Sequence, residues 1–126
     1  EIHWAAGIGT MGSTAEALAP ETQALGWLLE RLPGEARLMA LPGALSFASS
    51  AGAIYAGSGD EVITEQSLPA PTTAYAREKL TQEGLLQRFV AACQSMQADG
   101  WWWERPGLSN KAIKRGILRE MLAARF

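Results

Sequence analysis

The spacing of apolar residues predicts two amphipathic helices. Leucines recur at intervals of three and four between residues 18 and 32, and a Pro-Gly pair at residues 33–34 ends this pattern. A second helix is predicted from about residue 73 to about residue 98. The expected apolar faces are Leu18, Leu25, Leu28, Leu29 and Leu32 for the first helix, and Leu85, Leu86, Phe89, Val90, Cys93 and Met96 for the second.

Short apolar runs predict strands before each helix. Residues 2–6 and 44–49 are both followed by small residues, as buried strands of a parallel sheet often are. Residues 38–41 form either a short strand or part of the connection. Residues 57–73 are rich in Gly, Ser, Pro and Thr and predict a long loop. This alternation of strand and helix predicts an α/β fold. Near the C-terminus, residues 108–126 show the pattern of a basic amphipathic helix.

Composition narrows the class of protein. The chain has 126 residues, 48% of them hydrophobic and 19% charged, which suits one globular domain. A net charge of −2 gives no electrostatic basis for binding nucleic acid or an anionic membrane, and no apolar run reaches the roughly 18 residues that span a bilayer. The single Cys93 excludes an internal disulfide and most structural zinc sites. It favours a reducing compartment, so we expect a cytoplasmic location.

Two serines end the second predicted strand. In open α/β sheets the carboxyl ends of the strands line the ligand crevice, so Ser49 and Ser50 stand where a catalytic hydroxyl could lie. They could equally be ordinary serines at the start of a loop, and the segment alone leaves both interpretations open.

Tyr75 and Lys79 are four residues apart at the start of the second predicted helix. This spacing places them on one face. An ammonium group near a tyrosine stabilises the phenolate, and such a tyrosine can exchange a proton with a substrate hydroxyl. A pair of this kind also arises often by chance.

The order and spacing of four segments are more specific than any one of them. They are HWAAG (residues 3–7), FASSAGAIYAG (47–57), VITEQSLPAP (62–71) and YAREK (75–79). Together they resemble the extended short-chain dehydrogenases/reductases, the NAD-dependent epimerases and dehydratases of nucleotide sugars. The resemblance extends over roughly residues 1–98.

The resemblance implies a role for each matching residue. Tyr75 would be the catalytic acid/base on a sugar hydroxyl, Lys79 would hold the nicotinamide ribose and lower the tyrosine pKa, and Ser50 would hydrogen-bond the reacting oxygen. Ser49 fits that last role less well by spacing. The cofactor would be NAD or NADP, the substrate a nucleotide sugar, and a homodimer is a further possibility. The cofactor would be lined by Ala5, Ala6, Gly7, Tyr75 and Lys79.

The resemblance also implies a fold and its extent. We expect part of a Rossmann-like doubly wound parallel sheet, with residues 1–126 as one partial domain, residues 1–98 as its family-like core and residues 99–126 as a diverged segment. The family's first Gly-rich turn and its C-terminal substrate domain have no counterpart here, so we expect a fragment. GIGTMGS (residues 7–13) has a similar glycine pattern, but we interpret it as the loop after the fourth family strand.

Other residues favour plainer interpretations. His3 is the only histidine, and since no second His or suitably placed Cys supports a metal site, we interpret it as a strand residue. Trp101, Trp102 and Trp103 favour packing over stacking on sugars or bases. The alternative to an enzyme is a diverged, catalytically inactive α/β module that serves binding or assembly.

Overall fold

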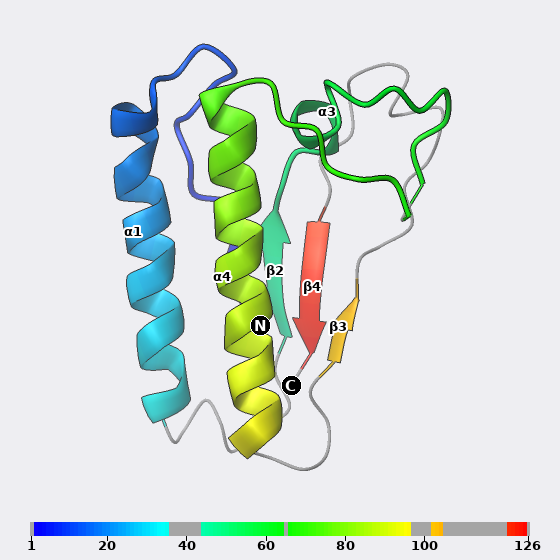
Figure 1. Ribbon diagram of the computed structural model, residues 1–126. Coiled ribbons are helices and arrows are strands. Elements are labelled where there is room, and N and C mark those ends of the chain that lie inside the picture. Colours follow the sequence, from blue (N-terminus) through cyan, green and yellow to red (C-terminus); the bar gives the residue numbers. More distant parts are fainter. Residues whose placement is uncertain (1, 36–43, 65, 97–101, 105–120, 126) are drawn as a thin grey trace.

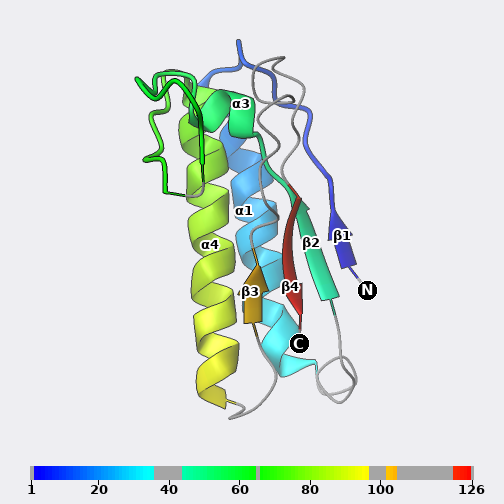
Figure 2. The same cartoon turned by 90° about the vertical axis from the view of Figure 1, so that its right-hand side faces the viewer.

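The computed structural model describes residues 2–35, 44–64, 66–96, 102–104 and 121–125. Two long helices cover one face of a four-stranded sheet, as Figures 1 and 2 show from two directions. The helices are α1 (Ala15–Arg31) and α4 (Ala74–Met96). The strands, in their spatial order, are β1 (Ile2–Trp4), β2 (Ala44–Ala48), β4 (Met121–Arg125) and β3 (Trp102–Glu104). The predicted α/β class is confirmed.

Strand pairing is mixed. β1 and β2 are parallel, with Ile2 opposite Leu45 and Trp4 opposite Phe47, as expected for a strand–helix–strand unit. β4 is antiparallel to both β2 and β3. The helix predicted for residues 108–126 is therefore wrong where β4 lies, because the ladder offered by β2 outweighs the helix propensity of this Leu- and Ala-rich segment. The rest of that prediction falls on residues outside the described part of the chain, as does the one for residues 38–41.

β1 is an edge strand in this order, which corrects the prediction that residues 2–6 are a buried strand. The strand ends at Trp4, its Ile2 and Trp4 side chains are half-buried, and His3 is exposed. β2 is the buried strand, because it has a neighbour on each side and its Leu45 and Phe47 are fully buried.

α1 begins and ends with clear signals. The Thr14 side chain caps the helix by accepting from the Ala17 amide at 3.3 Å, and the short 3₁₀ turn η1 (Leu32–Gly34) ends it. Pro20 lies inside the helix, not near its start, so the carbonyl of Glu16 lacks its intrahelical donor. Glu16 is exposed, where water can serve that carbonyl.

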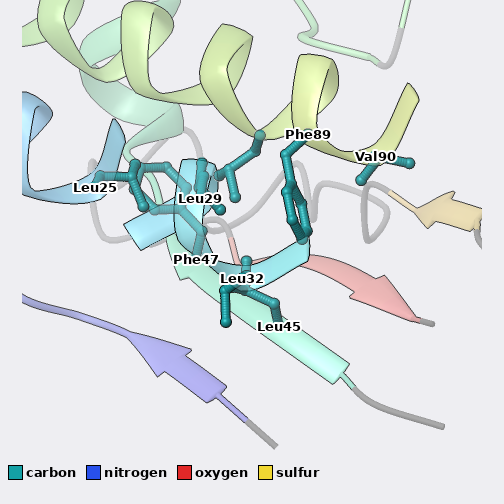
Figure 3. Packing of buried hydrophobic residues seen from close by; sticks show 8 residues of the cluster. Leu25, Leu29, Leu32, Leu45, Phe47, Phe89 and Val90 are labelled. Atoms are coloured by element: carbon teal, nitrogen blue, oxygen red, sulfur yellow. The ribbon is translucent and has the colours of Figure 1, made fainter. Parts of the chain in front are cut away.

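The core lies between the sheet and the two helices (Figure 3). Leucines on one stripe of α1 and η1 meet the inward face of β2 and the predicted apolar face of α4. Fully burying a side chain of this size stabilises the fold by about 1.5–3 kcal/mol. The buried members are Leu25, Leu29, Leu32, Leu45, Phe47, Leu86, Phe89 and Val90.

A short helix and a long loop follow β2. The helix α3 (Ala51–Ile54) leads into residues 57–73, where the described residues form no helix or strand, as predicted. The loop is closed at its base by hydrogen bonds from the Gly57 amide to the Ala70 carbonyl and from the Ala70 amide to the Ile54 carbonyl, each 2.9 Å long. Its Ile63 packs in a second small core with Ala51, Ile54 and Tyr55. The loop is therefore anchored to the body of the protein.

Candidate functional site

A cleft of about 490 Å³ opens beyond the carboxyl ends of the parallel strands β1 and β2. Ligands of open α/β sheets bind at this edge. Three segments form the walls: the loop after β1, the start of α3 and the start of α4. The lining residues are Gly9, Thr10, Met11, Ser50, Gly52, Ala53 and Tyr75.

The two serines after β2 have different surroundings. Ser49 is buried, and its hydroxyl donates to Oε1 of the buried Glu83 at 2.5 Å. Ser50 is half-buried, lines the cleft, and precedes α3 without capping it through its side chain. Of the two serines, Ser50 is therefore the one that lines the cleft.

Tyr75 enters the cleft from the second position of α4. That helix starts there because Thr73 Oγ1 accepts from the Ala76 amide at 3.1 Å. The Tyr75 ring is half-buried and lies against the loop after β1, since a Cβ added to Gly9 would stand 3.6 Å from Tyr75 Cδ2. Ser50 and Tyr75 thus reach the same cleft from different elements.

Lys79 follows one turn later on the same helix face. Its Nζ lies 5.7 Å from the centroid of the Tyr75 ring and 5.1 Å from that of Phe47. The ammonium donates to the Ala48 carbonyl at 3.4 Å and to Gln82 Oε1 at 3.2 Å. Lys79 is buried and is not among the residues that line the cleft, whereas Tyr75 is. The charge of Lys79 would therefore act on a ligand in the cleft from behind Tyr75.

The charge of Lys79 is opposed by burial and supported by carboxylates. Desolvation lowers the pKa of Lys79 below its ordinary value, while the negative charges of Glu21 and Glu83 partly restore it. Glu21 belongs to α1 and Glu83 to α4, so carboxylates from two elements support the ammonium.

Glu21 also fixes the glycine-rich loop after β1. One carboxylate oxygen, Glu21 Oε1, accepts from the amides of Ile8 and Gly9, each at 2.7 Å. In a dinucleotide-binding fold, backbone amides at the glycine-rich turn donate hydrogen bonds to the pyrophosphate. Here two amides of the glycine-rich loop donate to a carboxylate of the chain instead. These two amides are therefore already paired within the chain.

The residues predicted to line the cofactor through their backbone lie beside the cleft. Ala5, Ala6 and Gly7 are exposed directly after β1, and none of them is among the lining residues. The loop instead reaches the cleft further along, through Gly9, Thr10 and Met11. Sequence reasoning missed Thr10 and Met11 because the path of the loop depends on its bonds to Glu21.

Sequence reasoning also missed the buried polar side chains behind the cleft. Gln82 and Glu83 lie three and four residues after Lys79, a spacing that brings them to its face of a helix and could have identified them. Thr22, which accepts from Gln82 Nε2 at 2.9 Å, belongs to α1, and no sequence signal connects it to Lys79.

Searches of protein-family models, curated proteins and solved structures find no match to the chain. Among the described residues, no group of three or more His, Cys, Asp or Glu side chains is placed to hold a metal ion. No helix in the described part of the chain is long and apolar enough to cross a membrane.

Proposed function

We propose that the protein is an NAD(P)-dependent oxidoreductase of the epimerase/dehydratase type that acts on a nucleotide sugar by hydride transfer. One observation carries the proposal: Ser50 and Tyr75 line a single cleft at the strand ends, with the Lys79 ammonium 5.7 Å from the Tyr75 ring. In this proposal the parallel strands β1 and β2, covered on one face by α1 and α4, are part of a Rossmann-like sheet. The cleft lies at the carboxyl edge of these strands.

Each of the three side chains has a defined task. Tyr75, as the phenolate, takes the proton from the sugar hydroxyl as that carbon is oxidised, and the hydroxyl so formed returns the proton when the carbonyl is reduced. The Ser50 hydroxyl donates to the reacting oxygen, which gains carbonyl character, and so fixes its position. Lys79 places a positive charge next to Tyr75 that stabilises the phenolate while the proton is absent.

The cleft suits part of a nicotinamide cofactor. Its volume is within the range of small-molecule sites, and hydroxyl groups of Thr10, Ser50 and Tyr75 stand among small lining residues. The exposed residues 5–7 would contact the cofactor beside the cleft. Lys79 is buried and does not line the cleft, so its charge would act on the ribose from behind Tyr75. The bound cofactor supplies hydride acceptance and return.

A tyrosine-to-phenylalanine exchange tests the assignment, and the chain offers a matched control. Tyr75→Phe should lower turnover of nucleotide sugars at least 100-fold, because a general acid/base contributes about 10²–10⁴-fold. Turnover is followed by the absorbance of reduced nicotinamide and by product analysis over a panel of nucleotide sugars. Tyr55→Phe alters the other tyrosine, which is buried in the second core, and should keep most of the activity. Full turnover in Tyr75→Phe would refute the assigned role.

The second candidate function is a binding module without catalysis. It is favoured because polar groups at the site already have hydrogen-bond partners within the chain. The Lys79 ammonium donates to Ala48 and Gln82, and the amides of the loop after β1 donate to Glu21. A module of this kind would bind a nucleotide sugar, and NAD or NADP would leave the affinity unchanged. Calorimetry measures both properties. Heat of binding with either dinucleotide favours the enzyme.

A further inference from the structure

A chain of buried polar side chains connects helix α1 to the candidate site. Thr22 on α1 accepts from Gln82 Nε2 at 2.9 Å, and Gln82 Oε1 accepts from Lys79 Nζ at 3.2 Å. Gln82 is 2% exposed, so both ends of its amide are used inside the protein. A buried amide without hydrogen-bond partners would destabilise the fold, so this paired arrangement is strongly favoured.

The chemistry of the partners fixes the direction of the Gln82 amide. A lysine ammonium donates hydrogen bonds and cannot accept one, so the oxygen of Gln82 must face Lys79. The amide nitrogen then faces Thr22, whose hydroxyl oxygen can accept. Rotating the amide by half a turn would place its N–H groups against the ammonium and lose the favourable contact.

We propose that Gln82 is a positioning residue for Lys79, and that its amide, anchored by Thr22, holds the ammonium beside Tyr75. The inference rests on the proposed function, since it gives Lys79 the place from which its charge acts on Tyr75. It adds two residues, one on each long helix, to the set on which the site depends.

The surroundings of Lys79 explain why its ammonium needs a fixed hydrogen-bond acceptor such as Gln82. Lysine has a flexible four-carbon stem, and its ammonium is attracted by Glu21 from α1 and by Glu83 from α4. β2 contributes only a carbonyl, that of Ala48, and the face of the Phe47 ring. Without the Gln82 oxygen, the ammonium loses the acceptor that fixes its place beside Tyr75.

Variants of Gln82 and Thr22 separate positioning from packing. Gln82→Met keeps the length of the side chain and removes the acceptor, while Gln82→Glu keeps an acceptor and adds a negative charge. Thr22→Val keeps the shape of Thr22 and removes its oxygen, and Thr22→Ser restores a hydroxyl. The readout is the NMR titration of Lys79, labelled with ¹³C at Cε, in the full chain. The chain has three lysines, so the loss of a signal in Lys79→Met assigns it.

The expected shifts have opposite signs. The Lys79 titration should move to lower pH in Gln82→Met, to higher pH in Gln82→Glu, and to lower pH by a smaller amount in Thr22→Val, with Thr22→Ser near wild type. A role in packing alone would leave all of these titrations at the wild-type value, and that result would overturn the proposal. If Gln82→Met does not fold, Gln82→Glu and Thr22→Val provide the same test.

Dinucleotide binding distinguishes this inference from the function on which it rests. Gln82→Met should weaken NADH binding on the order of tenfold by calorimetry, because the Lys79 ammonium loses the hydrogen bond that holds its charge beside Tyr75 and the cleft. Lys79 titrations that shift as expected in a chain without dinucleotide binding would retain the positioning role and refute the proposed function. Unchanged Lys79 titrations in a chain that binds NADH strongly would refute the positioning role and retain the proposed function.

Discussion

Single residues decide how closely the loop after β1 approaches the helices. Gly9 is the clearest case, because a Cβ at this position would stand 2.2 Å from Leu18 Cδ2. Leu18 is 1% exposed, so its methyl group has little room to move. The glycine is required for packing and, through the loop, for the shape of the cleft.

Gly9→Ala should therefore lower the free energy of unfolding by about 1–3 kcal/mol, the usual cost of overfilling a packed site. Urea denaturation followed by circular dichroism measures this change. Gly12→Ala is the matched control, since no atom lies within 4 Å of a Cβ at that position. Equal stabilities of the two variants would contradict the close packing of Gly9 on Leu18.

Individual elements depend on their end signals as much as on their apolar stripes. α1 is capped by Thr14 and carries Glu16 in its first turn, where the positive end of the helix dipole lies. The bond from its own backbone amide, aided by Thr14, lowers the pKa of Glu16. These two residues place the start of the helix at Ala15, upstream of Pro20.

Thr14→Ala should reduce the free energy of unfolding by about 1 kcal/mol, because the Ala17 amide loses its acceptor. Thermal and urea denaturation test this effect. Thr81→Ala on α4 is the control: the exposed Thr81 hydroxyl donates to the Arg77 carbonyl within the helix, a bond that adds little. A Thr81 variant that loses as much stability as the Thr14 variant would argue against the cap.

At the scale of the whole molecule, Lys79 lies where α1, α4 and β2 meet. Its contacts on Gln82 and Ala48 tie the helix layer to the sheet, and Glu21 and Glu83 act on its charge. A charge at this junction makes the stability of the fold depend on pH.

The sign of that dependence follows from the lowered pKa of Lys79. Between its folded pKa and the ordinary value of 10.5, the unfolded chain binds more protons, so the free energy of unfolding rises with pH. Below the folded pKa both states are protonated, and the cost of burying the charge is fully present. Lys79→Met removes this contribution.

The free energy of unfolding of wild type minus that of Lys79→Met should therefore increase as pH rises from neutral toward 10.5. Urea denaturation at several pH values measures the difference, in which other titrating groups cancel. Arg77→Met is the control, because Arg77 is an exposed residue of the same helix, and its difference should be flat. A flat difference for Lys79→Met as well would contradict the lowered pKa.

Much of the fold could be read from local patterns. The stripe that includes Leu25 and Leu29 predicted the buried face of α1, and Leu86 with Phe89 predicted that of α4. The short apolar run before Ser49 predicted β2. These predictions succeeded because burial against one partner imposes a helical or strand period on the sequence.

The failures came from pairing over long distances. Residues 121–125 have the composition of a helix, and they form β4 because β2 presents an edge to them. Residues 2–4 are apolar enough for a buried strand, but the strand order puts them at an edge. Neither outcome can be predicted from the local sequence, since the hydrogen-bond partners of a strand come from elsewhere in the chain.

For the candidate site, local spacing is enough to identify which residues are available and which share a helix face: the hydroxyl of Ser50 after a strand, and Tyr75 with Lys79 one turn apart. Helix and strand periods act over a few residues, so spacing is sufficient to fix them. Three contacts could be seen only in the folded chain: Ser49 is buried against Glu83, Glu21 accepts from the amides of the glycine-rich loop, and Thr22 accepts from Gln82. These contacts join side chains on different elements, and packing of the whole chain brings such groups within hydrogen-bond distance.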